Sequence, residues 1–159
     1  MRRSEREITD RAQLTHILDS CKVLRLAMVD DGKPYVLPMN FGYEWSGELP
    51  TLVLHSAPEG RKLDILRKHP EICFELDCDH ELVEAPVDAA CGYGFRFSSI
   101  IGEGTVAELV DIAEKRAAID LLMACQTGGK TGFSYDDAVL ARTAVLRIAV
   151  SALSGKARA

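Results

Sequence analysis

Residues 52–64 read LVLHSAPEGRKLD, an apolar strand that passes through a short polar turn into a helix. The start of a helix offers unpaired backbone N–H groups and the positive end of the helix dipole. Arg61 adds a planar guanidinium that matches phosphate oxygens, Lys62 adds a point charge, and Ser56 adds a hydroxyl. The turn therefore predicts an anion site at the beginning of a helix.

Anion binding does not by itself explain His55, which begins this turn. Imidazole transfers protons near neutral pH, so His55 is a candidate for facing the reactive end of a ligand. A histidine at the end of a strand can equally be a satisfied core side chain. Arg61 and Lys62 can equally be solvated charges near a helix start. The residues alone leave both alternatives open.

The chain has 159 residues and a net charge of -5 at pH 7, which predicts a single domain over residues 1–159. The acidic balance argues against a nucleic-acid or membrane-surface partner. No apolar run approaches the roughly 20 residues of a membrane span, and no apolar signal core follows the charged first residues. We therefore expect a cytoplasmic protein. Its 5 cysteines include no Cys-x-x-Cys pair, which is typical of free thiols in a reducing compartment.

Hydrophobic periodicity and turn residues predict a mainly β chain with peripheral helices. Strands are expected at 23–29, 34–45, 51–55, 71–77, 95–109 and 144–150, and helices at 11–21, 60–68 and 111–125. Six strands joined by short hairpins favour a closed antiparallel barrel, which removes the exposed edges of an open sheet. Pro38 lies inside the second strand, where it predicts a bulge or an unpaired N–H.

Two segments are expected to be loops. The acidic segment 79–91 is expected to be irregular and exposed, and the Gly-rich segment 126–136 is expected to be mobile. The run Asp77-Cys78-Asp79-His80 contains metal-ligand residue types, but adjacent residues of a strand point to opposite faces. Because a zinc site needs ligands that converge, the sequence predicts no metal site.

Several short motifs follow one another over nearly the whole chain. They are Glu7-Ile8-Thr9-Asp10, Arg25-Leu26-Ala27, the stretch 34–43 (PYVLPMNFGY), His55-Ser56-Ala57 with Gly60-Arg61-Lys62, Ser98-Ser99-Ile100 with Gly102-Glu103-Gly104, and Ser154-Gly155-Lys156. In this order they resemble the flavin-binding split-barrel superfamily that includes pyridoxamine 5′-phosphate oxidase. Within that superfamily, the chain is most similar to the nitroimidazole-resistance (Nim) type of protein.

The resemblance implies a six-stranded antiparallel split β-barrel that forms a homodimer, with one FMN per subunit near the interface. By matching positions, the phosphate of FMN would be held by Ser56, Gly60, Arg61 and Lys62. Pro38, Met39 and Asn40 would line the isoalloxazine ring, and Ser98 and Ser99 would lie close to the cofactor. His55 matches a histidine that lies near the flavin in Nim-like proteins and is assigned a catalytic role there.

One motif departs from the pattern of the oxidases. They carry Thr-Asn before a Ser-Arg-Lys, whereas this chain has Ser56-Ala57 and then Gly60 before Arg61. The change removes two polar side chains, which points away from pyridoxamine phosphate as the substrate and gives backbone N–H groups a larger part in phosphate binding.

Two classes of function follow from the resemblance. The first is an FMN-dependent oxidoreductase that reduces a small organic acceptor, of the nitroaromatic type by resemblance, with His55 as proton donor or substrate anchor. In that class the flavin carries the electrons and the protein supplies binding and orientation. The alternative is a non-catalytic flavin-binding module, or a module that holds haem or a deazaflavin in the same cleft.

Overall fold

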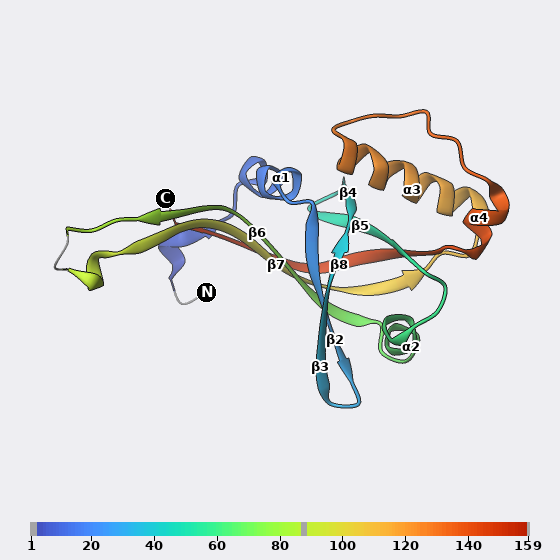
Figure 1. The fold of residues 1–159 in the computed structure, drawn as a ribbon, viewed down its shortest axis with the longest axis horizontal. Helices are drawn as coiled ribbons and strands as arrows, with labels where there is room; N and C mark the ends of the chain where they lie inside the picture. Colours follow the sequence, from blue (N-terminus) through green and yellow to red (C-terminus); the bar gives the residue numbers. More distant parts are fainter. Residues whose placement is uncertain (1–2, 87–88, 159) are drawn as a thin grey trace.

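The computed structural model describes residues 3–86 and 89–158. In this part of the chain, eight strands form one antiparallel sheet in the order β3-β2-β6-β7-β8-β5-β4, with β1 added beside β8 (Figure 1). The strands are β1 (Glu7–Ile8), β2 (Val23–Asp30), β3 (Lys33–Asn40), β4 (Gly42–Ser46), β5 (Leu49–Ser56), β6 (Glu71–Val83), β7 (Gly94–Glu108) and β8 (Ala144–Arg158). The helices are α1 (Arg11–Ser20), α2 (Arg61–Lys68), α3 (Ile112–Thr127) and α4 (Asp137–Arg142), with 3₁₀ turns at Ser4–Arg6 and Ala90–Gly92.

The curled sheet encloses one main core. Along β2, Leu24, Leu26 and Met28 are buried, and they alternate with more exposed residues, as expected for a strand with one face on the core. Large side chains from the other long strands, such as Phe74 and Leu146, fill the same interior. The predicted fold, a mainly β antiparallel split barrel with peripheral helices, is confirmed.

The predicted second strand, residues 34–45, is wrong as a single element. It divides at Phe41 into β3 and β4, which lie at opposite ends of the hydrogen-bonded path of strands. Gly42 sits at the division, where a Cβ atom would lie 2.5 Å from the Cα of Leu122 in α3. The chain therefore leaves one edge of the sheet and passes beneath a helix to reach the other edge. Pro38 stays in continuous register with Arg25, so β3 has no bulge there.

The expected loop at 79–91 is wrong in its first part, because β6 continues to Val83 and pairs with the start of β7. The two strands form an arm that extends away from the barrel in Figure 1. A register shift between Cys78 and Glu81, with Asp79 in the left-handed region at φ 59°, lets the ladder resume beyond it. The sequence did not predict this part of the strand, because its acidic residues interrupt the alternation of apolar and polar residues that is typical of a strand.

Helix α3 covers the outer face of β4 and β5, and α4 packs against α3 (Figure 1). As predicted, Asp111 begins α3: its carboxylate accepts hydrogen bonds from the backbone N–H groups of Ala113 and Glu114, both at 2.9 Å. Helix α4 lies beyond the expected Gly-rich loop and was not predicted from the sequence. Along β5, Leu52 and Leu54 belong to the barrel core and Val53 to a smaller cluster beneath α3.

The barrel is open on the side where β3 and β5 approach each other, since these strands share no ladder in the described part of the chain. Helix α2 follows β5 at this opening. None of the helices described here is long and apolar enough to cross a membrane.

Candidate functional site

The turn into α2 has the backbone expected of an anion site. Gly60 is the N-cap residue at φ 125°, a conformation that residues with a side chain rarely adopt. Its carbonyl accepts from the N–H groups of Leu63 and Asp64, which begins the ladder of the helix. Because the first N–H groups of a helix have no acceptor within it, they remain available at this end.

Lys62 is the cation of this turn that has no acidic partner. Its Nζ lies 3.2 Å from the Sδ of Met39, a weak acceptor at the end of β3. No ion pair among residues 3–86 and 89–158 includes Lys62, and burial lowers the pKa of its ammonium group. A half-buried ammonium beside a thioether is poorly solvated. An anion bound at this point would offset the cost of burying that charge.

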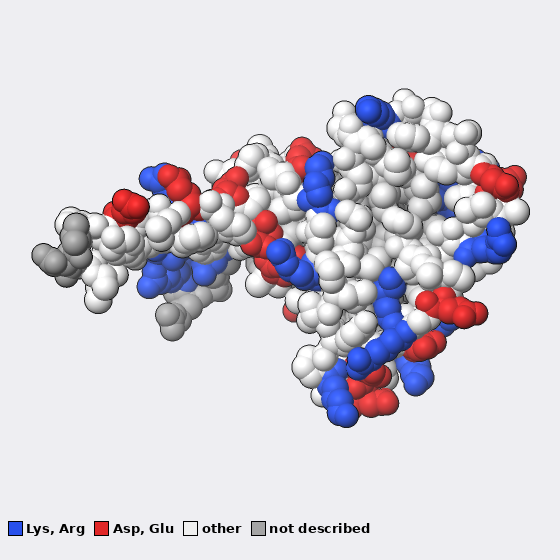
Figure 2. Space-filling model, viewed as in Figure 1, with Lys and Arg blue, Asp and Glu red and all other residues white. Residues whose placement is uncertain are grey.

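Arg61 differs from its neighbour because the β2–β3 hairpin already holds it. Its Nε lies 2.9 Å from Oδ2 of Asp30, and its guanidinium carbon lies 4.3 Å from the centre of the Tyr35 ring. Figure 2 shows acidic and basic side chains crowded together around this lower end of the molecule. Neither Asp30 nor Tyr35 was a predicted site residue, since the first belongs to a turn signal and the second to a strand pattern.

His55 and Ser56 leave β5 on opposite faces. Ser56 is half-buried on the side of Leu54, and its hydroxyl donates to the carbonyl of Ala57 at 2.8 Å. His55 is exposed and pairs in register with Val145, so it shares the face of β5 that α3 covers further along. The structure thus places Ser56 nearer the barrel opening and turns His55 away from it.

The three residues at the end of β3 also divide between the two faces. Met39 is buried in the barrel core, whereas Pro38 and Asn40 are exposed. The amide of Asn40 donates to the backbone carbonyl of Lys22 at 3.0 Å, so Asn40 helps to hold the end of the strand. Met39 and Lys62 are the predicted residues that the structure brings into direct contact.

Ser98 and Ser99 lie elsewhere on the molecule. Ser98 lines a cavity of about 400 Å³ against α1, and Ser99 lines another of about 340 Å³ with Lys156. Neither of these two cavities is lined by a residue of the turn 55–62, and the Ser99 hydroxyl donates to the backbone carbonyl of Lys156 at 3.5 Å. Their part in one common site stays a prediction.

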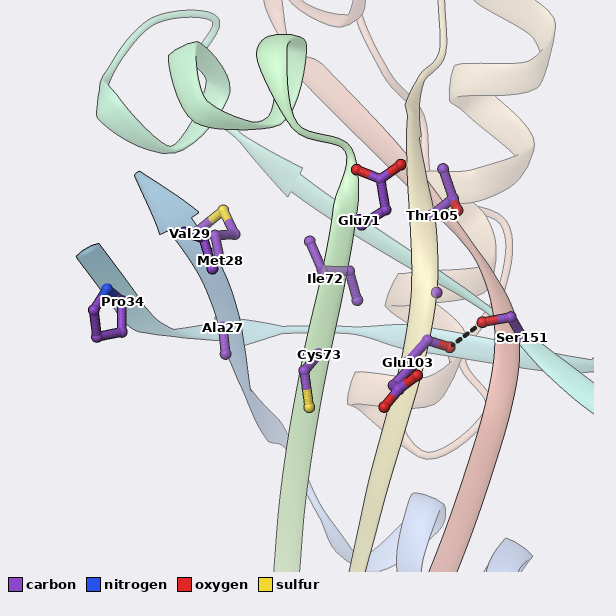
Figure 3. Close-up of a pocket in the computed structure, with 11 residues that line it drawn as sticks. Ala27, Met28, Val29, Pro34, Glu71, Ile72, Cys73, Glu103, Thr105 and Ser151 are labelled. Atoms are coloured by element: carbon purple, nitrogen blue, oxygen red, sulfur yellow. Dashed lines mark hydrogen bonds between the residues drawn. The ribbon is translucent and has the colours of Figure 1, made fainter. Parts of the chain in front are cut away.

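A further hollow of about 410 Å³ lies on the outer face of the sheet (Figure 3). Cys73 of β6 and Glu103 of β7 lie side by side in it, and the Ser151 hydroxyl donates to the backbone carbonyl of Glu103 at 3.3 Å. None of the predicted site residues lines this hollow. Among the described residues there is also no group of three His, Cys, Asp or Glu placed to hold a metal ion.

Comparison with known proteins assigns the family. The family model described as pyridoxamine 5′-phosphate oxidase matches residues 10–157. The chain belongs to the pyridoxamine 5′-phosphate oxidase family. The resemblance found in the short motifs is therefore confirmed, and with it the similarity to the Nim type. No curated protein sequence matches the chain significantly.

Several solved structures share the fold of this chain. A candidate 5-nitroimidazole antibiotic resistance protein from Bacteroides thetaiotaomicron is 34% identical, with a TM-score of 0.82 over 95% of this chain and 86% of that chain. The flavocytochrome Anf3 from Azotobacter vinelandii is 21% identical, with a TM-score of 0.77 over 96% of this chain and 69% of that chain. A FAD and heme binding protein from Mycobacterium smegmatis is 23% identical, also at 0.77, over 96% and 73%.

Proposed function

We propose that this member of the pyridoxamine 5′-phosphate oxidase family binds FMN and acts as a flavin-dependent oxidoreductase. The observation that carries the proposal is the Lys62 ammonium group, which is half-buried at the start of α2 and lies against a thioether instead of a carboxylate. A phosphate fits this position because it would accept from Lys62 and from the free N–H groups of the helix. The family membership and the binding of FAD by a neighbour of the same fold support the choice of a flavin.

In this proposal the phosphate end of FMN lies at Ser56, Gly60, Arg61 and Lys62. Met39 links this end to β3, so the ring would extend along Pro38 and Asn40, with Ser98 and Ser99 of β7 further off. Bound flavin supplies two-electron transfer to an acceptor. The protein residues then have to bind it, orient it and hold a proton near the acceptor.

The acceptor in this proposal is a small organic molecule of the nitroaromatic type. The 34% identity to a protein described by 5-nitroimidazole antibiotic resistance supports this class. His55 is the residue we assign to proton donation, because it is an exposed imidazole one residue from the proposed phosphate site.

We also propose a homodimer, located in the cytoplasm, with no nucleic-acid or membrane partner. The outer face of the sheet supports the dimer, since Val29, Val36 and Ile101 expose 54%, 57% and 51% of their surface there. A second copy over this face would also cover the exposed Pro38, and an isologous contact would give two equivalent sites. Light scattering tests this directly, and a monomer with bound flavin would contradict it.

A non-catalytic flavin-binding module is the second candidate. It is favoured by one observation: His55 leaves β5 on the face opposite to Ser56, so the imidazole points away from the side on which the phosphate would bind. The same argument would hold for a haem or deazaflavin carrier of this fold.

The test is a fluorescence titration of the purified protein with FMN, followed by steady-state assays of nitroaromatic reduction with NAD(P)H or a chemical reductant. We expect saturable FMN binding and turnover well above that of free FMN. Lack of FMN binding would end the proposal, whereas binding without turnover would leave the module. His55→Ala, with the exposed His69→Ala as matched control, should keep FMN affinity and lose turnover.

A further inference from the structure

We propose that Asp30 is a built-in counter-ion of the anion site, which competes with the FMN phosphate for Arg61 and so weakens FMN binding. This inference rests on the proposed flavin function and concerns how tightly that same site holds its ligand. It assigns a role to a residue of the β2–β3 hairpin, which lies 31 residues before Arg61 in the chain.

The geometry sets the two cations of the turn apart. Arg61 has a carboxylate on its Nε at 2.9 Å and an aromatic ring beneath it, while Lys62 has a sulfur atom only. A phosphate that arrives at α2 therefore meets one free cation and one that is already paired. Full use of Arg61 requires the phosphate to share the guanidinium with Asp30 or to displace it.

Asp30 could instead assist binding by holding Arg61 in place, so the sign of its effect has to be decided. Tyr35 also holds the guanidinium, with 4.3 Å between the guanidinium carbon and the ring centre, and this contact does not depend on Asp30. The side chain of Asp30 is 30% exposed, which leaves its charge only partly screened by solvent. Because FMN carries a phosphate dianion, repulsion from a carboxylate on the same guanidinium outweighs the remaining help in orientation.

The experiment compares the affinities for FMN and for riboflavin, which has the same ring and no phosphate, at one fixed ionic strength. Asp30→Asn should tighten FMN binding about fivefold, as expected for the loss of one partly exposed charge pair, and leave riboflavin binding unchanged. Asp31→Asn is the matched control, since it removes the same charge from the adjacent turn residue, which has no ion pair among the described residues. It should change FMN affinity less than twofold.

The double variant identifies the route of the effect. In an Arg61→Met background, Asp30→Asn should lose most of its gain, because the two residues act through one contact. Inorganic phosphate, used as a competitor of FMN, should itself bind about fivefold more tightly to Asp30→Asn than to wild type, because it meets the same unpaired guanidinium. Asp30→Ser gives a second neutral replacement if the asparagine variant folds poorly.

The possible outcomes separate the two proposals. If wild type binds no FMN, the proposed function and this inference both fail. If wild type binds FMN and Asp30→Asn binds it equally well or more weakly, only the role of Asp30 is overturned. An equal gain for riboflavin would also overturn it, because the effect would then not involve the phosphate.

Discussion

Two lysines at helix ends, Lys115 and Lys62, illustrate how this fold treats a partly or fully buried cation. Lys115 is only 7% exposed, and its Nζ donates to three backbone carbonyls at the end of α4: Leu140 and Ala141 at 3.3 Å and Thr143 at 2.8 Å. Lys62 lies at the opposite kind of helix end, where N–H groups are exposed, and contacts Met39. The first charge is satisfied by the fold and the second is left for a ligand.

The electrostatics of the two helix ends explain this difference. Carbonyl groups at a C-terminus attract an ammonium, so Lys115 stabilises the loop and short helix that follow α3. At an N-terminus the helix dipole disfavours the same ammonium. Burial also lowers the pKa of Lys62. A lysine that opposes its surroundings in the unliganded protein is favourable once an anion binds beside it.

The largest expected effect of a substitution is on the satisfied lysine. Lys115→Met leaves three carbonyls at the C-terminal end of α4 without their donor, so we expect a loss of about 3 kcal/mol in the free energy of unfolding. Urea denaturation measures it, and Lys130→Met, at an exposed site in the same region, is the control with little effect. A Lys115→Met variant as stable as wild type would mean that Lys115 does not anchor α4.

Substitutions of two glycines compare a closely packed position, beneath α3, with an open one at the start of α2. Gly42→Ala places a Cβ against the backbone of Leu122 in α3, which should cost about 2 kcal/mol of stability. A second change, Leu122→Ala, should not rescue it, because the clash is with main-chain atoms. At Gly60 nothing lies within 4 Å, so Gly60→Ala costs only backbone strain, about 1 kcal/mol. Thermal unfolding compares them, and equal losses would contradict the contrast.

Substitution of Lys62 should affect ligand binding and not stability, which is the opposite of the result expected for Lys115. Lys62→Met should weaken FMN binding at least about tenfold, because a charged hydrogen bond to phosphate is lost. Its stability without ligand should equal or slightly exceed that of wild type, since a desolvated charge is removed. Titration calorimetry and unfolding on the same samples test both parts. A clear loss of stability in unliganded Lys62→Met would show that Lys62 stabilises the folded protein and is not reserved for a ligand.

The smallest expected effect is a dependence on pH. Burial lowers the pKa of Lys62 in the folded protein, so below that value both states are protonated and the destabilisation is fully present. Between the lowered pKa of the folded state and the unfolded value of about 10.4, the unfolded chain binds more protons than the folded protein, so stability rises with pH. The stability deficit of wild type relative to Lys62→Met should therefore shrink across this window. A constant difference from about pH 8 to about pH 11 would contradict the sign.

Much of the fold follows from local patterns. The strand periodicity, the turn at Asp31 and Gly32 and the cap at Asp111 are properties of short segments, and the structure confirms them. The predictions were wrong where the structure of a segment depends on packing against distant residues. The break at Gly42 depends on α3, and the extension of β6 depends on its pairing with β7. No pattern within either segment contains that information.

Local periodicity and turn chemistry are enough to predict that residues 52–64 form a strand, a polar turn and the start of a helix with two cations. Which of those two cations lacks an acidic partner depends on how distant segments pack. Asp30 and Tyr35 come from a hairpin far back in the chain and hold Arg61, while Met39 is the contact made by Lys62. Pairing of charges depends on distances in space, and the order of residues along a chain does not state them.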